Sequence, residues 1–228
     1  MSDDEKTETS KLSGLGRVPL HRPTRKAPAV SIIISGRNEI DYVRAFPTAQ
    51  SHLIRAEFEL VFVDTGSTDG TNDAAIDIGF KVHAAPASER SSDADLRNRG
   101  WRISHGKLLL FLDAGAPYYP EFLPKAMYTM RDETVGAAIP LLRQQRVPGE
   151  PAVFSAPNGV ADAVGHHALV RRGCMRQLDG FRAAGTPETD FADRLSGHGF
   201  ALRGVKVRQA AVPEPGSMVD ALKRLFPR

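Results

Sequence analysis

Residues 58–70 read FELVFVDTGSTDG, and this stretch decides the fold. Its first part, residues 58–63, is a mostly apolar run that predicts a buried strand. Its second part, residues 64–70, combines glycines with hydroxyl and carboxylate side chains and predicts a turn. Apolar residues at helical spacing follow at positions 74, 75 and 78. The stretch is therefore typical of a strand, a turn and a helix in succession.

Similar apolar runs lie on either side of this unit. Residues 30–34 read VSIII, residues 80–82 read FKV, and residues 107–112 read KLLLFL. The first run lacks polar alternation, which indicates a strand covered on both faces. Strands that alternate with helices imply right-handed crossovers and a largely parallel sheet. We therefore predict an α/β fold of the Rossmann-like kind, with a mainly parallel sheet flanked by helices.

The helices and the remaining strands are predicted from caps, prolines and apolar spacing. Asn38 can cap a helix that runs to about residue 53, and Pro47 inside that window favours a kink. The other expected elements are a helix through Leu96, Gly100 and Ile103, a helix after Pro120, a strand at residues 135–139, a loop or short antiparallel strands at residues 143–163, and a last helix at residues 219–226.

Length and composition favour one folded domain with tails. The chain has 228 residues, of which 41% are hydrophobic, so it can bury a full core. Residues 1–28 are polar, contain several prolines and show almost no apolar periodicity, which indicates a flexible tail. We expect the folded domain at residues 29–215 and a short C-terminal helix or tail at residues 216–228.

Charge, cysteine content and hydropathy exclude several classes of protein. A formal net charge of +3 is too small for the dense basic surface of a dedicated nucleic-acid binder. The single cysteine, Cys174, rules out an intramolecular disulfide framework and a zinc site built from several cysteines. No run approaches the roughly 20 apolar residues that cross a bilayer, and the N-terminus lacks a signal-peptide pattern. These features predict a cytoplasmic protein without a transmembrane segment.

Three polar turns should meet at one edge of the predicted sheet, because the carboxyl ends of parallel strands lie together. The first reads SGRNE at residues 35–39, the second spans residues 64–70, and the third reads DAG at residues 113–115. Glycines let a backbone approach a ligand, while hydroxyls and carboxylates orient a base, a ribose or a diphosphate. The combination predicts a nucleotide site.

In order and spacing, these motifs resemble those of family 2 glycosyltransferases, over roughly residues 29–210. The resemblance implies a GT-A fold with a smaller antiparallel portion on the acceptor side. It also implies transfer of a sugar from a nucleoside diphosphate sugar, with UDP-sugars favoured and with inversion at the anomeric carbon. Further matches are Arg97-Asn98 with Gly100 and Gly106, Pro120-Glu121-Phe122-Leu123, Asp179-Gly180-Phe181, and the segment from Glu188 to Leu195.

The resemblance also identifies candidate donor-binding residues. Thr65 stands where many relatives carry a second aspartate that contacts the base, and its hydroxyl can still form a hydrogen bond. The candidates are Ser35, Arg37, Asn38, Glu39, Asp64, Thr65, Ser67, Arg97, Asp113, Ala114 and Gly115.

The metal-binding part of the family pattern is incomplete. The family's fourth strand ends in Asp-x-Asp, whose final carboxylate usually binds a divalent cation, and here that position is Gly115. Asp113 alone among the motif residues is a candidate ligand for Mn²⁺ or Mg²⁺, and no histidine follows His198. The charge of the leaving diphosphate would then need arginines such as Arg97, or helix N-termini.

Inverting transfer needs a carboxylate that takes the proton of the acceptor hydroxyl as its oxygen attacks the anomeric carbon. Counting back from Arg194, the resemblance places Glu188 at the position of this base, with Asp190 close by. A second interpretation stays open, because Pro187, Glu188 and Asp190 also suit the first turn of a helix. The two interpretations are compatible.

Several residues also have a structural interpretation. Arg97 and Asn98 would contact the donor diphosphate or support its loop, or else form an exposed helix face. His166 and His167 would point to opposite faces of a strand, which favours a structural role over a metal site. Trp101 is expected in the core. At the level of the whole protein, the alternative is a nucleotide-sugar-binding or scaffolding protein that has lost catalysis.

The acceptor is the least determined partner. Six arginines give the second half a basic bias, which fits an anionic acceptor or, preferably, a solvated basic surface. Residues 219–228 combine apolar and basic side chains, so they could contact a membrane surface, pack on the domain or join two subunits. The six arginines are Arg171, Arg172, Arg176, Arg182, Arg203 and Arg208.

Overall fold

The computed structural model describes residues 27–49, 57–84, 91–114, 119–143, 154–156, 164, 167–182 and 187–207. The expected last helix, at residues 219–226, and nearly all of the expected N-terminal tail lie outside these residues. Within the described residues, no helix has the length and apolar character needed to cross a bilayer.

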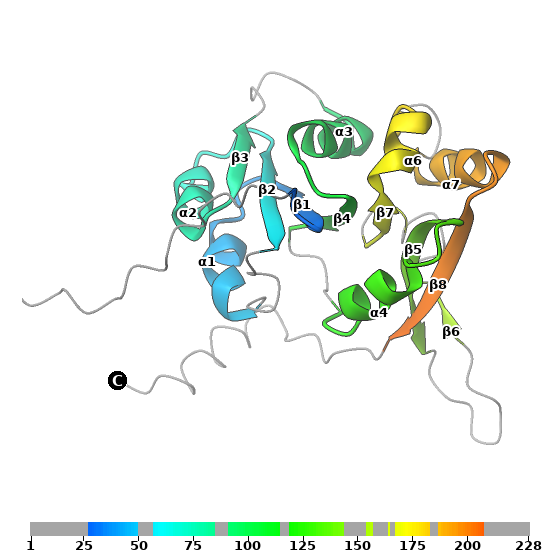
Figure 1. Ribbon diagram of the computed structural model, residues 1–228. Coiled ribbons are helices and arrows are strands. Elements are labelled where there is room, and N and C mark those ends of the chain that lie inside the picture. The colour runs from blue at the N-terminus through cyan, green and yellow to red at the C-terminus, as the bar shows by residue number, and fades with distance from the viewer. Residues whose placement is uncertain are drawn as a thin grey trace, which may run out of the picture.

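The first half of the described chain alternates strands and helices as predicted (Figure 1). β1, β2, β3 and β4 pair in parallel, in the spatial order β3-β2-β1-β4. Their carboxyl ends therefore lie at one edge of the sheet. The elements are β1 (Val30–Gly36), α1 (Ile40–Ala49), β2 (Phe58–Asp64), α2 (Thr71–Ile78), β3 (Lys81–Ala84), α3 (Asp93–Ile103) and β4 (Leu108–Asp113).

The second half continues the same sheet with mixed directions. β7 pairs antiparallel with β4 and with β5, which in turn pairs antiparallel with β6 and parallel with β8. The predicted mainly parallel sheet with a smaller antiparallel portion is confirmed. The elements are α4 (Phe122–Thr129), β5 (Val135–Arg143), β6 (Phe154–Ser155), β7 (Leu169–Arg171), α6 (Arg172–Gln177), α7 (Pro187–Gly197) and β8 (Ala201–Val207).

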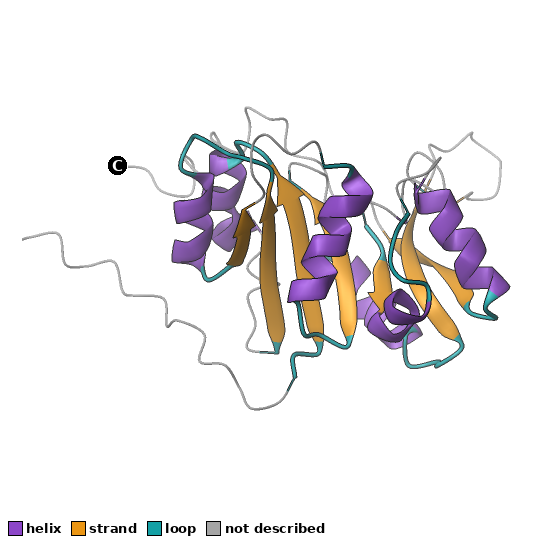
Figure 2. Cartoon of the chain, turned by 90° about the horizontal axis from the view of Figure 1, so that it is seen from above, coloured by secondary structure: helices purple, strands orange, loops and turns teal. Residues whose placement is uncertain are grey.

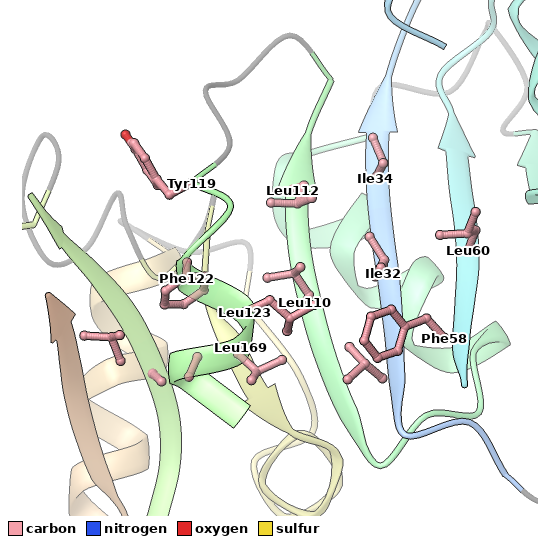
Figure 3. Packing of buried hydrophobic residues seen from close by; sticks show 14 of the residues in the cluster. Ile32, Ile34, Phe58, Leu60, Leu110, Leu112, Tyr119, Phe122, Leu123 and Leu169 are labelled. Carbon is pink, nitrogen blue, oxygen red and sulfur yellow. The ribbon is translucent and has the colours of Figure 1, made fainter. Parts of the chain in front are cut away.

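Helices cover both faces of the sheet (Figure 2). On one face, Ile32 and Ile34 of β1 pack in a cluster with residues of α1, α2 and α4. On the other face, Ile33 packs in a cluster with residues of α3, α6 and α7. Figure 3 shows the first cluster, where side chains of β1, β4 and α4 meet. Burial of residues 30–34 of β1 confirms the strand covered on both faces.

Close packing places α3 directly on the sheet. A side chain at Gly100 of α3 would collide with Ile33 of β1, because the helix backbone lies so near the strand. Just after the C-terminal end of α3, the backbone N–H of Gly106 donates to the hydroxyl of Ser31, 2.7 Å away. The C-terminal half of α3 and the segment after it are therefore held close to β1.

Candidate functional site

The turns that follow β1 and β2 are interlocked by hydrogen bonds in both directions. The backbone N–H of Asn38 donates to the Ser67 hydroxyl at 2.8 Å, and that of Thr68 donates to the Asn38 side-chain oxygen at 2.9 Å. The backbone N–H and the hydroxyl of Thr65 both donate to the carbonyl of Gly36, at 3.2 and 3.3 Å. The predicted proximity of these two turns is confirmed.

The N-terminus of α1 is capped by the turn after β2, not by Asn38. The backbone N–H of Glu39 donates to the Thr71 hydroxyl at 2.9 Å, and that of Ile40 donates to the Asp69 carboxylate at 3.3 Å. Asn38 has a left-handed φ of 55°, and its side-chain oxygen is used by the other turn. The predicted cap was therefore wrong, because a long-range contact replaced the local one.

Asp64 organises the turn that it begins. It is 1% exposed, and its carboxylate accepts the backbone N–H groups of Gly66 and Ser67 at 3.0 to 3.1 Å. The Ser67 hydroxyl and the side-chain amide of Asn72 also donate to it. Sequence reasoning missed Asn72 because its contact with Asp64 depends on how the turn folds back onto α2. The Asp64 carboxylate therefore shapes the turn from within.

Asp113 joins this edge from the end of β4. Its half-buried carboxylate accepts the Ser35 hydroxyl at 3.1 Å, and the backbone N–H of Ala114 donates to the Ser35 carbonyl at 2.8 Å. A Cβ on Gly36 would lie 2.7 Å from that of Ala114, so only glycine fits there. Three turns thus meet at one edge, as expected, while Gly115 lies outside the described residues.

Acidic groups dominate the electrostatics of this edge. Burial and the neighbouring charge of Asp69 raise the pKa of Glu39. Burial, and then the charges of Glu39 and Asp113, raise the pKa of Tyr42. These four groups are close enough to influence one another, although Tyr42 was not singled out from the sequence. Arg37, exposed in the turn after β1, is a cation of the same edge.

Side chains of the described residues do not form a divalent metal site by themselves. Mn²⁺ and Mg²⁺ take several oxygen ligands, yet no group of three or more His, Cys, Asp or Glu side chains in the described ranges could hold an ion. Asp113 offers its carboxylate, and Gly115 offers no side chain in the sequence. His167 is buried against the ring of Tyr119, with ring centroids 5.3 Å apart, and His166 lies outside the described residues.

Arg97 and Asn98 are buried, so the exposed helix face was wrong. Their exposed fractions are 2% and 7%. The guanidinium carbon of Arg97 lies 5.6 Å from the centroid of the Phe181 ring, and Asn98 hydrogen-bonds the backbone of Phe181. In this structure both side chains contact Phe181 and so support the turn that contains it. The predicted contact with the donor diphosphate or support of the donor loop stays a prediction.

Helix α7 begins at Pro187, as its sequence predicts, and Glu188 lies in its first turn. The Asp190 carboxylate accepts Nε of Arg194 at 2.7 Å and lies 3.9 Å from a guanidinium nitrogen of Arg182. Asp190 is therefore engaged in ion pairs along its own helix and with the preceding turn.

Arginines of the second half are used to hold backbone carbonyls. Arg171 donates to the carbonyls of Met130, Asp132 and Val135 at 2.8 to 3.2 Å. Arg172, which is 9% exposed, donates to the carbonyls of Gly106 and Trp101 and to the Ser104 hydroxyl. Two of the six arginines are thus used to hold backbone groups of the protein itself. Arg176, Arg182 and Arg203 are exposed, whereas Arg208 lies outside the described residues.

A family model and two curated relatives match this chain. The model described as Glycosyl transferase family 2 matches residues 31–178. Two proteins of Bacillus subtilis (strain 168) match over 114 residues: "Putative teichuronic acid biosynthesis glycosyltransferase TuaG", at 27% identity, and "Putative glycosyltransferase EpsH", at 26%. The matches cover 49% and 48% of this chain but 45% and 32% of those proteins. The chain therefore spans less than half the length of either relative.

Solved structures share the fold. A mannosyltransferase from Pyrobaculum calidifontis, in complex with GDP-Man and Mn²⁺, has a TM-score of 0.61 at 22% identity, covering 88% of this chain and 61% of that one. Glucosyl-3-phosphoglycerate synthase from Mycobacterium tuberculosis, in complex with Mn²⁺, UDP and phosphoglyceric acid, has a TM-score of 0.59 at 21% identity, covering 86% and 75%. These likenesses confirm the GT-A fold.

Proposed function

This chain belongs to glycosyl transferase family 2, and on that premise we propose that it transfers a sugar from a nucleoside diphosphate sugar to an acceptor hydroxyl. The observation that carries the proposal is the meeting of three polar turns at one sheet edge. Asn38 and Ser67 lock two of these turns together, and Ser35 joins them to Asp113. A rigid set of backbone and side-chain polar groups beyond parallel strands suits a nucleotide.

For the donor we favour a uridine diphosphate sugar. Several complexes of one structural neighbour contain UDP, although another neighbour is in complex with GDP-Man. Thr65 hydrogen-bonds to Gly36 in the middle of the interlocked turns, where its hydroxyl oxygen can also accept from a base. Ser35, Asn38, Glu39 and Ala114 complete the proposed donor-side wall.

For the chemistry we assign the base to Glu188. The acceptor oxygen attacks the anomeric carbon opposite the diphosphate, and the Glu188 carboxylate takes the hydroxyl proton, so that configuration inverts. Asp190 is the weaker candidate, because its carboxylate is already paired with Arg194. Glu188 can act as the base and also stabilise the N-terminus of α7, because the helix dipole favours a carboxylate in the first turn.

The leaving diphosphate needs positive charge, and arginine is the group we assign to it. The amides at the start of α1 already donate to Thr71 and Asp69, so they are occupied. Arg37 is exposed at the same edge, whereas Arg97, in the second turn of α3, is buried. Because side chains of the described residues form no metal site by themselves, we derive no step through a metal.

The test is a donor panel. Purified full-length chain is incubated with UDP-glucose, UDP-N-acetylglucosamine, UDP-galactose and GDP-mannose, and release of free diphosphate is measured with added Mn²⁺, with Mg²⁺ and with EDTA. We expect release from a UDP-sugar, changed less than about threefold by EDTA. A rate that vanishes in EDTA and returns with Mn²⁺ would overturn the assignment of charge to arginine.

Gly115 motivates a second candidate function, a nucleotide-sugar-binding protein without catalysis. Loss of the usual second carboxylate removes a residue on which the family's chemistry ordinarily rests. The same panel separates the two functions when UDP binding is measured by calorimetry alongside turnover. Clear binding of UDP with no release from any donor, with or without metal, would favour this candidate over the enzyme.

A further inference from the structure

The side chain of Asn98, in α3, forms hydrogen bonds with the backbone of Phe181, 83 positions further along the chain. Its side-chain nitrogen donates to the Phe181 carbonyl at 2.7 Å, and its side-chain oxygen accepts the Phe181 N–H at 2.9 Å. The same oxygen accepts the indole N–H of Trp101 at 3.1 Å. With both ends of the amide engaged in a buried place, the contact is a specific clamp between α3 and residues 178–182.

The clamped turn is shaped to fit against α3. Asp179 and Gly180 both have a left-handed backbone, with φ of 53° and 74°. A Cβ on Gly180 would collide with the Asn98 side chain and would lie 3.0 Å from the indole nitrogen of Trp101. Gly180 therefore serves two needs at once, the positive φ and the close approach.

The same turn is bound to helix α7 from its other side. Arg194 of α7 donates to the carbonyls of Leu178 and Gly180 at 2.6 and 2.9 Å. The rings of Phe181 and Phe191 lie 4.6 Å apart between centroids. Residues 178–182 and α7 are thus held as one unit.

The clamp also ties this unit to the donor half of the sheet. Phe181 packs edge-on against Phe111 of β4, with ring centroids 5.3 Å apart. The guanidinium carbon of Arg97, in α3, lies 5.6 Å from the centroid of the Phe181 ring. β4 ends two residues later in Asp113, one of the proposed donor-site residues. A continuous chain of contacts therefore runs from β4, through Phe111 and Phe181, to α7, and Asn98 holds Phe181 in place within it.

We propose that Asn98 is a positioning residue, which fixes α7 and its Glu188 relative to the donor edge without contacting the donor. The inference rests on the proposed function, since it needs Glu188 to act as the base. A displacement of about 1 Å between reacting groups can cost roughly 10²-fold in rate. Asn98→Ala should therefore slow turnover roughly 10- to 100-fold and leave UDP affinity within about twofold.

The first measurement needs no activity. Amide hydrogen exchange in Asn98→Ala should rise in residues 178–182 and 187–197 but stay unchanged in β2. Trp101 is the only tryptophan of the sequence, so its emission reports on the clamp and should shift when its partner Asn98 is removed. Ser104→Ala is the matched control, because it removes buried hydrogen bonds at the far end of the same helix.

The second measurement is a double-mutant cycle on turnover of the best panel donor. If Asn98 acts through Glu188, Asn98→Ala should add little to the loss already caused by Glu188→Gln. Multiplying losses would overturn the positioning role while leaving the base assignment intact. No effect of Glu188→Gln would instead overturn the base assignment, and with it this inference.

Two more outcomes decide the proposal. A fall of tenfold or more in UDP affinity on Asn98→Ala would mean that Asn98 serves the donor, which contradicts the positioning role. If Asn98→Ala does not fold, Gly180→Ala pushes the same turn away from Asn98 and should give the same exchange pattern and the same split between rate and affinity. Unchanged exchange in α7 with Gly180→Ala would overturn the proposal.

Discussion

The two halves of the sheet stabilise their turns and loops with side chains of opposite charge. Carboxylates do so in the parallel half, and arginines in the mixed half. Beyond the parallel strands, Asp64 and Asp69 accept backbone N–H groups of the turns. In the mixed half, Arg171, Arg172 and Arg194 donate to backbone carbonyls. The first arrangement leaves acidic groups at the edge where a nucleotide is proposed to bind. The second uses the positive charge of Arg171 and Arg172 inside the protein, whereas Arg176, Arg182 and Arg203 remain exposed.

The largest expected effect is on turnover: Glu188→Gln should slow the reaction without weakening UDP binding. Glu188→Gln keeps the shape of the side chain but removes the base, so turnover of the best donor should fall roughly 10²- to 10⁴-fold. UDP affinity should stay within about twofold, because the donor edge belongs to the other half. Rates and calorimetric affinities measured side by side check this. Asp193→Asn, an exposed change of the same kind on α7, is the control. Full activity of Glu188→Gln would show that the base lies elsewhere.

Asp64→Ala should give the reverse pattern. The change leaves two backbone N–H groups and the Asn72 amide without their acceptor, so the free energy of unfolding should drop by about 2–3 kcal/mol. A loosened turn should also weaken UDP binding about tenfold or more. Urea unfolding and calorimetry measure the two effects. Asp77→Ala, on the exposed side of α2, should change neither. A stable variant with normal UDP affinity would contradict the organising role of Asp64.

Arg172→Met tests whether a buried arginine stabilises the mixed half of the sheet. Burial lowers the pKa of Arg172, and its guanidinium donates hydrogen bonds to the Trp101 carbonyl and the Ser104 hydroxyl. Removing the guanidinium should cost about 2 kcal/mol in the free energy of unfolding, since those acceptors lose a buried donor. UDP affinity should not change. Arg176→Met, exposed on the same helix, serves as the comparison. Equal stabilities of the two variants would speak against a structural use of the arginines.

The smallest effect is pH-dependent and concerns Glu59 at the opposite edge. Burial alone would raise the pKa of Glu59, but hydrogen bonds from Ser31 and from His105 outweigh it and lower the pKa. A lowered pKa in the folded state stabilises the protein above the ordinary value, and this contribution disappears as pH falls through the folded value. Glu59→Gln should thus lose about 1 kcal/mol at pH 7 and little near pH 3.

Chemical unfolding from pH 3 to pH 7 measures that difference. Glu133→Gln, exposed before β5, is the control and should follow the unmodified chain throughout. If Glu59→Gln is destabilised by the same amount at pH 3 and pH 7, the ionised carboxylate is not the source of its contribution.

The parallel half could be predicted from the sequence because local signals and packing agree there. The run from Val30 to Ile34 has no polar alternation, and it forms a strand buried on both faces. The turn from Asp64 to Gly70 carries its own hydrogen-bond acceptors, so its position after β2 follows from composition. The shared edge then follows from parallel pairing alone.

The mixed half could not be predicted to the same depth, because its decisive contacts join distant residues. Arg171 and Arg172 look like surface charges in the sequence, yet their partners lie more than 30 positions away. Asn98 showed no sign of its partner Phe181, 83 positions further along the chain. The predicted Asn38 cap was also wrong because of a long-range contact: the side-chain oxygen of Asn38 accepts the backbone N–H of Thr68.

The pairing of β4 with β7 has a consequence for motion. Leu108, Leu109 and Leu110 pair antiparallel with residues 171 to 169, so one hydrogen-bonded sheet crosses the junction between the two halves. Rotation of one half against the other would break this ladder and separate the buried side chains on both faces. Among the described residues, the ladder between β4 and β7 therefore opposes a hinge motion between the two halves of the sheet.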